Sequence, residues 1–150
     1  MKFTRTLLLA LGLAIVVAWA GDDPFIGSWK MQVKKSKGVQ PDFQTFTPAA
    51  DGYNLVWLHN DLALDVHLRL DGQDRPIPPE HFTILERMQG ETYSYTRKGN
   101  VMETIFKRGG SPVGTLRREV SANGRVMTMT VDGTDSTGGK FHDVSVWAKH

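Results

Sequence analysis

Residues 64–70 read Leu64-Asp65-Val66-His67-Leu68-Arg69-Leu70, with an aliphatic residue at every even position and a polar residue at every odd position. Side chains of a β-strand alternate between its two faces, so a period of two predicts a strand with one buried face. A helix would spread these aliphatic side chains around its circumference. The stretch therefore indicates a half-buried strand.

Turn signals divide the rest of the chain into segments of similar length. They recur at intervals of about ten residues: Asp51-Gly52, Asn60-Asp61, Asp71-Gly72, Gly99-Asn100, Gly109-Gly110, Asn123-Gly124, Asp132-Gly133 and Gly138-Gly139. The segments between them are rich in Thr, Val and aromatic residues, which favour strands. Besides 64–70, we predict strands over Phe25–Val33, Phe43–Pro48, Tyr53–His59, Phe82–Met88, Thr92–Lys98, Val101–Lys107, Val113–Ser121, Val126–Asp132 and Lys140–Lys149.

This pattern predicts an all-β antiparallel meander. Closure into a barrel of about 8–10 strands removes the exposed edges that an open sheet of this size leaves. A two-sheet sandwich is the alternative, because its strands alternate in the same way. The proline-rich segment 75–80 cannot donate a regular ladder of hydrogen bonds, so we interpret it as a loop or edge passage between two meanders.

Composition limits the kind of protein. The chain has 150 residues and no cysteine, which excludes disulfide frameworks and thiolate metal sites. Residues 1–20 resemble a secretory signal peptide, with basic Lys2 and Arg5, an apolar run over 7–17 and a cleavage pattern ending at Ala20. We expect one domain over 21–150, secreted or periplasmic and without a membrane anchor.

Charge argues against nucleic acid as a partner. The whole chain has 18 basic and 16 acidic residues, and both Lys2 and Arg5 belong to the predicted signal peptide. The remaining chain is therefore neutral. A neutral domain has no general field that would attract a phosphate backbone.

The start and end of the predicted domain resemble a known superfamily. Residues 23–31 read Asp-Pro-Phe-Ile-Gly-Ser-Trp-Lys-Met, and 117–130 and 146–149 are similar to closing hairpins of the same proteins. The Gly27-x-Trp29 pair resembles the opening of lipocalins and fatty-acid-binding proteins, which are calycin barrels, and the overall pattern resembles small secreted bacterial lipocalin-like proteins of unassigned function. The resemblance implies that Trp29 plugs one end of a barrel and that Gly27 permits close backbone approach.

The sequence also departs from fatty-acid-binding proteins. Those proteins carry a pair of lid helices between their first two strands, whereas residues 34–42 are too few for two helices. They hold the ligand carboxylate with Arg-x-Tyr on the last strand, where this chain has Ser145 and Trp147. The resemblance thus implies the barrel without the lid, and not that particular ligand.

Large adaptable side chains on the later strands are candidates for a ligand pocket, because thioethers and aromatic rings conform to varied apolar shapes. Plain core packing is the alternative. Arg117 and Arg118 are adjacent, so one of them should point inward, where it would meet an anionic head group or the carboxylate of Glu103 or Glu119. The candidate pocket residues are Tyr93, Tyr95, Met102, Phe106, Arg117, Met127, Met129 and Trp147.

A second cluster depends on the register of one hairpin. If Val56 and Leu58 share a face with the aliphatic residues of 64–70, then His59, Asp65 and His67 share the other face. Two imidazoles and a carboxylate can bind a divalent metal or move a proton. The favoured interpretation is a solvated outer face with cross-strand charge pairs.

These observations predict a secreted, non-enzymatic protein that holds a small hydrophobic or amphipathic molecule inside a barrel. One alternative is a protein-interaction or inhibitor module with a filled barrel. Another is a small secreted enzyme that uses the His/Asp cluster. No sequence motif implies a cofactor or a bound metal.

Overall fold

The computed structural model describes residues 23–33, 42–59, 62–78 and 87–150, and in these ranges it is an antiparallel β-structure. No helix in the described ranges is long and apolar enough to cross a membrane. The strands are β1 (Gly27–Met31), β2 (Phe43–Ala49), β3 (Gly52–His59), β4 (Leu62–Arg69), β5 (Arg75–Pro76), β6 (Thr92–Lys98), β7 (Val101–Arg108), β8 (Ser111–Val120), β9 (Val126–Thr134) and β10 (Lys140–Lys149).

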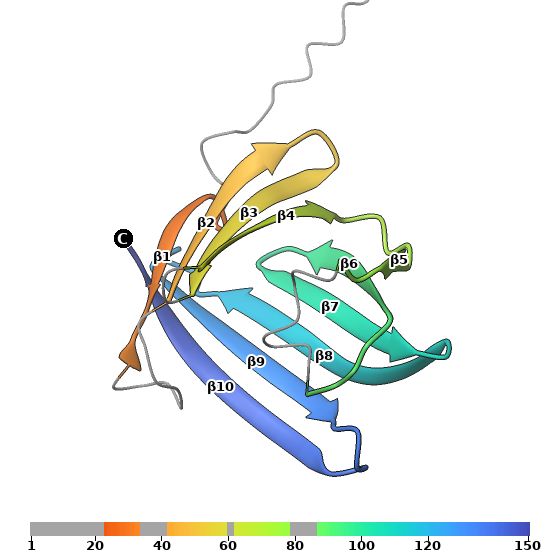
Figure 1. The fold of residues 1–150 in the computed structure, drawn as a ribbon. Helices are drawn as coiled ribbons and strands as arrows, with labels where there is room; N and C mark the ends of the chain where they lie inside the picture. Colours follow the sequence, from red (N-terminus) through yellow and green to blue (C-terminus); the bar gives the residue numbers. More distant parts are fainter. Residues whose placement is uncertain (1–22, 34–41, 60–61, 79–86) are drawn as a thin grey trace, which may run out of the picture.

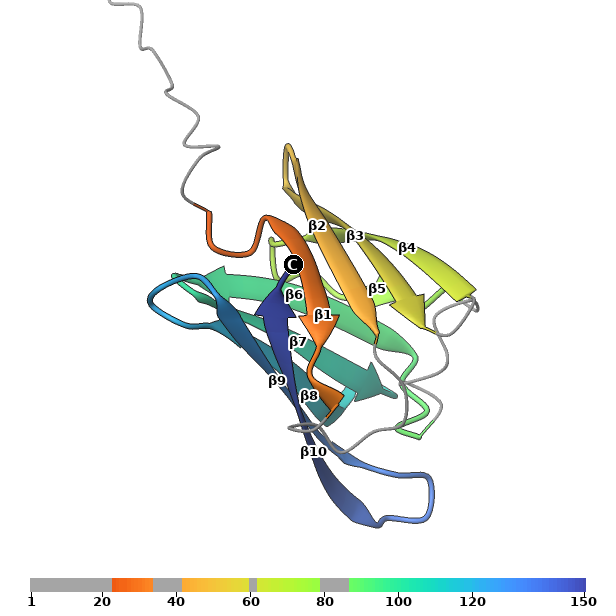
Figure 2. The same ribbon diagram turned by 90° about the vertical axis from the view of Figure 1, so that its left-hand side faces the viewer.

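All ten strands belong to one sheet, in the order β4-β3-β2-β1-β10-β9-β8-β7-β6-β5. Consecutive strands are neighbours except β4 and β5, which form the two edges, and β1 joins β10 so that the two halves of the chain meet. The sheet curls until β4 comes into contact with β6 (Figures 1 and 2). The predicted all-β meander is confirmed, and the single curled sheet favours the barrel over the sandwich.

The sequence predicts a loop or an edge passage over 75–80, and the edge alternative is confirmed; two other predictions need correction. Arg75–Pro76 is a short edge strand, in which Arg75 pairs with Tyr93 and Pro76 with Thr92. The predicted strand over 82–88 falls mostly outside the described residues, and its last two residues, Arg87 and Met88, lie in a turn. Gly133 was expected in a turn but lies within β9, opposite Gly114 of β8.

The predicted register of the β3–β4 hairpin was wrong. Tyr53 pairs with Leu68 and Trp57 with Leu64, so odd positions of β3 share the inner face with even positions of β4. Leu58, expected inside, is 43% exposed. The physical reason is volume: the inner face takes the larger side chains of β3 and leaves the smaller aliphatic ones outside.

One end of the barrel is closed by aromatic side chains around Trp29. Phe25, Trp29, Phe46 and Tyr53 are all buried. The Trp29 Nε1–H donates to the carbonyl of Phe25 at 2.9 Å, which satisfies the polar atom that an interior indole carries. Trp29 therefore lies where the resemblance placed it.

A polar group fastens the same end. Asp23 accepts a hydrogen bond from the Tyr53 hydroxyl at 2.5 Å and pairs with Arg97 of β6 at 2.5 Å. Arg97 also donates to the Tyr53 hydroxyl and lies over the Phe25 ring, 5.0 Å from its centroid. The N-terminal segment thus connects β3 with β6 across the end of the barrel.

Gly52 is required for close approach between β3 and β4. Its φ is +155°, and a β-carbon would overlap the carbonyl oxygen of Leu68. We expect Gly52→Ala to lower the free energy of unfolding by about 3 kcal/mol, because strain and overpacking add. Gly99 is the matched control: its φ is +61° with nothing within 4 Å, so Gly99→Ala should cost only about 1 kcal/mol. Equal shifts in urea denaturation would contradict the close-approach argument.

Candidate functional site

Arg118 is the most unusual residue of the interior. On β8, Leu116, Arg118 and Val120 are buried, and the alternation places Arg117 and Glu119 on the other face. Arg117 pairs with Glu119 at 2.5 Å, and both are about half exposed. The choice of Arg117 as the inward arginine was therefore wrong, and the inward residue is its neighbour.

The Arg118 guanidinium is incompletely satisfied. It is 2% exposed, and its Nε donates to Oε1 of Gln44 at 3.2 Å. Its Nη1 is buried without a hydrogen-bond partner. Its central carbon lies 5.8 Å from the ring centroid of Phe46 and 5.9 Å from that of Trp57. Cation–π contacts of this kind compensate part of the lost hydration.

No acidic side chain of the described ranges neutralises Arg118. Its pKa is lowered to about 10 by burial, and the one opposing electrostatic influence comes from Tyr95. Glu103 lies opposite Arg117 in the β7–β8 register, on the outer face. A buried cation with neither a carboxylate nor a full set of acceptors is costly to the fold.

Two further hydroxyl groups lie near Arg118. Met102 pairs with Arg118 across β7 and β8, and Thr104 follows on the same inner face, opposite Tyr95 of β6. The Thr104 Oγ1 is buried and lies close enough to the Tyr95 hydroxyl to oppose the rise in the pKa of Tyr95, although the pair does not have hydrogen-bond geometry. Burial raises the pKa of Tyr95 to about 12, although the charge of Arg118 opposes the shift.

These groups form a donor-rich site in an apolar interior. At neutral pH the Arg118 guanidinium is charged and the Tyr95 phenol is protonated, because their pKa values are about 10 and about 12. Charged and neutral N–H and O–H donors together bind an oxyanion well. We call Arg118, Gln44, Tyr95 and Thr104 the Arg118 cluster.

The other residues predicted for the pocket point into the same interior. The register brings Tyr93 opposite Phe106 and Met129 opposite Arg118, and Met127 opposite both Val120 and Trp147. Whether they contact a ligand stays a prediction. The buried members of that set are Tyr93, Met102, Phe106, Met127, Met129 and Trp147.

Sequence reasoning missed Gln44 and Thr104. Both are polar residues at inward positions of strands whose flanking inward neighbours are large and apolar, Phe46 beside Gln44, and Met102 and Phe106 beside Thr104. That break in the inward apolar pattern is the signal that identifies them.

The candidate His/Asp metal cluster does not come together. His59 is the last residue of β3 and shares the inner face with Trp57. Its Nδ1 lies 2.9 Å from the buried carboxylate of Asp42, which also accepts a hydrogen bond from the Trp57 Nε1–H at 3.0 Å. Asp65 and His67 lie on the outer face, as the corrected register requires. The described residues contain no group of three or more metal-ligating side chains.

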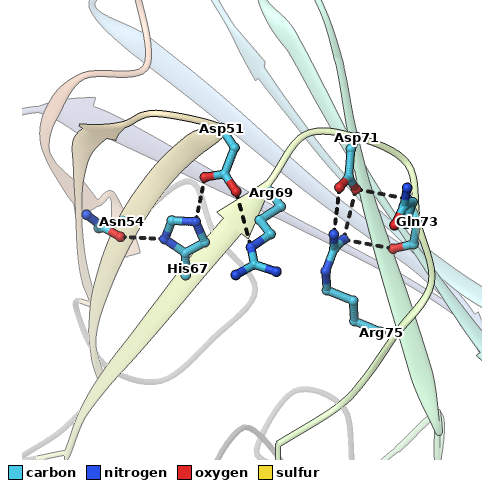
Figure 3. A network of polar contacts seen from close by, with 7 residues as sticks. All are labelled: Asp51, Asn54, His67, Arg69, Asp71, Gln73 and Arg75. Atoms are coloured by element: carbon cyan, nitrogen blue, oxygen red, sulfur yellow. Dashed lines mark hydrogen bonds and ion pairs between the residues drawn. The ribbon is translucent and has the colours of Figure 1, made fainter.

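His67 instead belongs to an exposed polar network on the outer face (Figure 3). Its Nε2 lies 2.6 Å from Asp51 and its Nδ1 lies 2.8 Å from Asn54. The hydrogen bond from His67 is the main reason that the pKa of Asp51 is lowered. This network is the cross-strand pairing that the sequence favoured over a metal site.

A neighbouring ion pair stabilises the turn after β4. Arg75 donates to both oxygens of Asp71 at 2.8 and 2.6 Å, and these bonds hold the pKa of Asp71 well below its usual range (Figure 3). The backbone N–H of Gln73 also donates to Asp71, at 3.0 Å. Such exposed pairs order a turn but contribute little stability.

Solved structures share this architecture, although no family model and no curated protein matches the sequence. The REP1-NXSQ fatty acid transporter superposes with a TM-score of 0.58 at 14% identity, over 83% of this chain and 95% of that one. The zebrafish ileal bile acid-binding protein, solved with cholic acid, has a TM-score of 0.59 at 11% identity, over 85% and 99%. A fatty acid-binding protein from Drosophila melanogaster brain has 0.58 at 18%, over 83% and 98%.

The fold is calycin-like. The expectation drawn from Gly27-x-Trp29 is therefore confirmed at the level of architecture, with Trp29 buried at the closed end. At the two positions of the last strand that differ from fatty-acid-binding proteins, the Trp147 Nε1–H donates to the Ser145 hydroxyl at 2.9 Å. The segment 34–41, where a lid was predicted to be absent, lies outside the described residues.

Proposed function

We propose that the protein binds a small amphipathic anion inside the barrel, with the acidic group of the ligand at the Arg118 cluster. The apolar body of the ligand would lie against the methionine and aromatic side chains of the inner face. This proposal narrows the hydrophobic or amphipathic ligand predicted from the sequence to an amphipathic anion.

The observation that supports this proposal best is the unpartnered Nη1 of a fully buried arginine. A guanidinium in an apolar interior loses the free energy of hydration. Hydrogen bonds to acceptors, best of all charged ones, are needed to offset that loss. In the described part of the chain, the Arg118 Nε donates to the neutral Gln44 oxygen, while the Nη1 has no acceptor. A carboxylate, sulfonate or phosphate would supply both the charge and the missing acceptor.

The comparisons are in keeping with this class of ligand. Two of the similar structures are a fatty acid transporter and a bile acid-binding protein solved with cholic acid, and both kinds of ligand are amphipathic carboxylic acids. The three similar structures described above are binding or transport proteins, which supports a non-enzymatic role. Ser145 and Trp147 stand at the positions of the last strand where fatty-acid-binding proteins have the Arg-x-Tyr pair that holds the carboxylate. In this chain the acidic group would instead be held by Arg118 of β8.

We also propose export. The signal-peptide pattern of residues 1–20 lies outside the described residues and is the basis for this part. Expression of the full chain in a bacterial host should yield a protein in the envelope or medium that begins at Gly21. Intact mass and N-terminal sequencing check it, and a protein retained in the cytoplasm with Met1 would overturn it.

A binding experiment tests the ligand class. We expect residues 21–150 to bind 1-anilinonaphthalene-8-sulfonate saturably, and dodecanoate to displace this dye at concentrations where dodecanol does not. Native mass spectrometry of the protein from its host should show an extra mass that is lost on denaturation. Absence of both signals would contradict the proposal and favour a filled barrel that acts through its surface.

A further inference from the structure

Met88 occupies the end of the barrel opposite Trp29. It lies in the turn Arg87–Gln89, is 0% exposed and packs onto β8 and β9 where Gly114 pairs with Gly133. A β-carbon at Gly114 would overlap the Met88 Sδ, and one at Gly133 would lie 2.9 Å from it. Two facing glycines therefore form a notch that the thioether fills together with the Phe141 ring, whose Cζ would lie 2.5 Å from a β-carbon at Gly133.

The notch is in line with the Arg118 cluster. Gly114, Leu116 and Arg118 alternate onto the same inner face of β8, and Gly133, Val131 and Met129 run beside them on β9. Four residues of strand span about 13 Å, at 3.3 Å per residue. Met88 thus covers the inner face at a point about 13 Å along β8 from the backbone of Arg118.

The polar contacts that hold the Arg87–Gln89 turn to the barrel are weak. Arg87 pairs with Asp143 at 3.3 Å, but both side chains are more than half exposed. Arg87 also lies over the Phe141 ring, 4.2 Å from its centroid. Gln89 has φ +48°, in the left-handed region that disfavours a residue with a side chain. Weak ion pairs and local strain both favour opening.

The end around Trp29 is held by a connected set of contacts. There the Asp23, Tyr53 and Arg97 group ties the N-terminal segment to two strands, and the Trp29 indole is hydrogen-bonded to Phe25. Detaching this end would break several buried contacts at once. At the Met88 end, the described contacts of the Arg87–Gln89 turn are the buried thioether, the exposed Arg87–Asp143 ion pair and the contact of Arg87 with the Phe141 ring.

We propose that Met88 is a stopper and that the ligand reaches Arg118 through the Gly114–Gly133 notch when Met88 withdraws. The proposal rests on the proposed function for what enters, but the opening itself is a property of the empty protein. The glycines have a defined role in it: they add no side chain of their own to the passage, which the Phe141 ring beside Gly133 borders once the thioether has moved.

Thiol accessibility tests the opening without any ligand, because the chain has no cysteine of its own. Leu116 lies directly inside the notch and Val120 lies on the same strand near the closed end, and both are buried. We expect Met88→Ala to raise the rate at which Leu116→Cys reacts with a small anionic methanethiosulfonate by at least about tenfold, since it removes the stopper. Met88→Leu should keep the slow rate.

Val120→Cys is the matched control and should not respond to Met88→Ala. An unchanged rate at Leu116→Cys would overturn the stopper, and so would an equal rise at both cysteines, because that pattern means general loosening. The result does not depend on whether the protein binds amphipathic anions.

Ligand kinetics then connect the stopper with binding. In stopped-flow mixing with the naphthalenesulfonate dye, Met88→Ala should accelerate association and dissociation together by about tenfold and change Kd much less, as expected for a gate. Equal rates in Met88→Ala and the parent protein would overturn entry at this end. Failure of the parent to bind the dye would refute the proposed function and leave the thiol result standing.

Discussion

Arg118→Met is expected to remove anion binding and to stabilise the empty barrel. Methionine keeps most of the buried volume but takes away the charge, so the dye 1-anilinonaphthalene-8-sulfonate should lose at least about 30-fold in affinity, equivalent to about 2 kcal/mol. The free energy of unfolding should rise by about 1–2 kcal/mol, because an incompletely paired buried cation disappears and one Gln44 hydrogen bond is lost. Fluorescence titration and urea denaturation measure the two effects.

N-phenyl-1-naphthylamine is the matched control ligand, since it has the same apolar body without the sulfonate. Its affinity should be the same in Arg118→Met and in the parent protein. Arg117→Met is the matched control variant, because Arg117 is on the outer face and pairs with Glu119. Unchanged affinity for the sulfonate dye in Arg118→Met would mean that the guanidinium is only a structural group.

The pH dependence of stability follows from the same burial. Burial lowers the pKa of Arg118 in the folded protein to about 10, below its ordinary value in the unfolded chain. At neutral pH both states hold the proton and the cost of the buried charge is fully present. As pH rises through about 10, the folded state releases the proton while the unfolded state keeps it, so this contribution to stability increases with pH. The advantage of Arg118→Met should therefore shrink above pH 10.

The alternation of residues made most of the architecture predictable. Turn dipeptides and period-two segments fixed nine of the strand positions to within a few residues, because hairpins are local structures. Trp29, Met127 and Trp147 were assigned correctly to the interior side of the sheet. These predictions needed only the order of residues within each strand and its turns.

What failed depended on contacts between distant residues. Arg118 lies on the same face of β8 as Leu116 and Val120. The sequence alone does not show which face of this strand is the inner one, so Arg117 was an equally good candidate for the inward arginine. The β3–β4 register reversed because Tyr53 and Trp57 fill the interior in place of Val56 and Leu58. No local pattern indicates that Met88 packs onto Gly114 and Gly133, since the three are far apart in sequence.

Gln44→Glu is expected to have the second large effect, because it supplies Arg118 with an internal counter-ion. The Gln44 Oε1 already lies 3.2 Å from the Arg118 Nε, and its Nε2 lies 3.7 Å from the Met129 sulfur. A glutamate in the same rotamer places a carboxylate against the guanidinium. The net charge of the Arg118 cluster becomes zero. A ligand anion must then compete for Arg118 with the carboxylate that the substitution introduces into the protein.

Affinity for the sulfonate dye should therefore fall in Gln44→Glu by at least about 30-fold, as it does when a buried charge loses its partner. Unlike Arg118→Met, this variant keeps the guanidinium and removes only its need for an external anion. Affinity for N-phenyl-1-naphthylamine should stay the same, which reports an intact apolar interior. Fluorescence titration of both dyes measures the difference.

Gln44→Met separates charge from hydrogen bonding. It removes the acceptor from the Arg118 Nε but adds no charge, so the cluster stays cationic and the sulfonate dye should still bind. A site that recognises anions by charge loses the dye in Gln44→Glu and keeps it in Gln44→Met. If both variants lost the dye equally, Gln44 would act by positioning Arg118, and if neither lost it, the dye would bind elsewhere and the proposed site would be wrong.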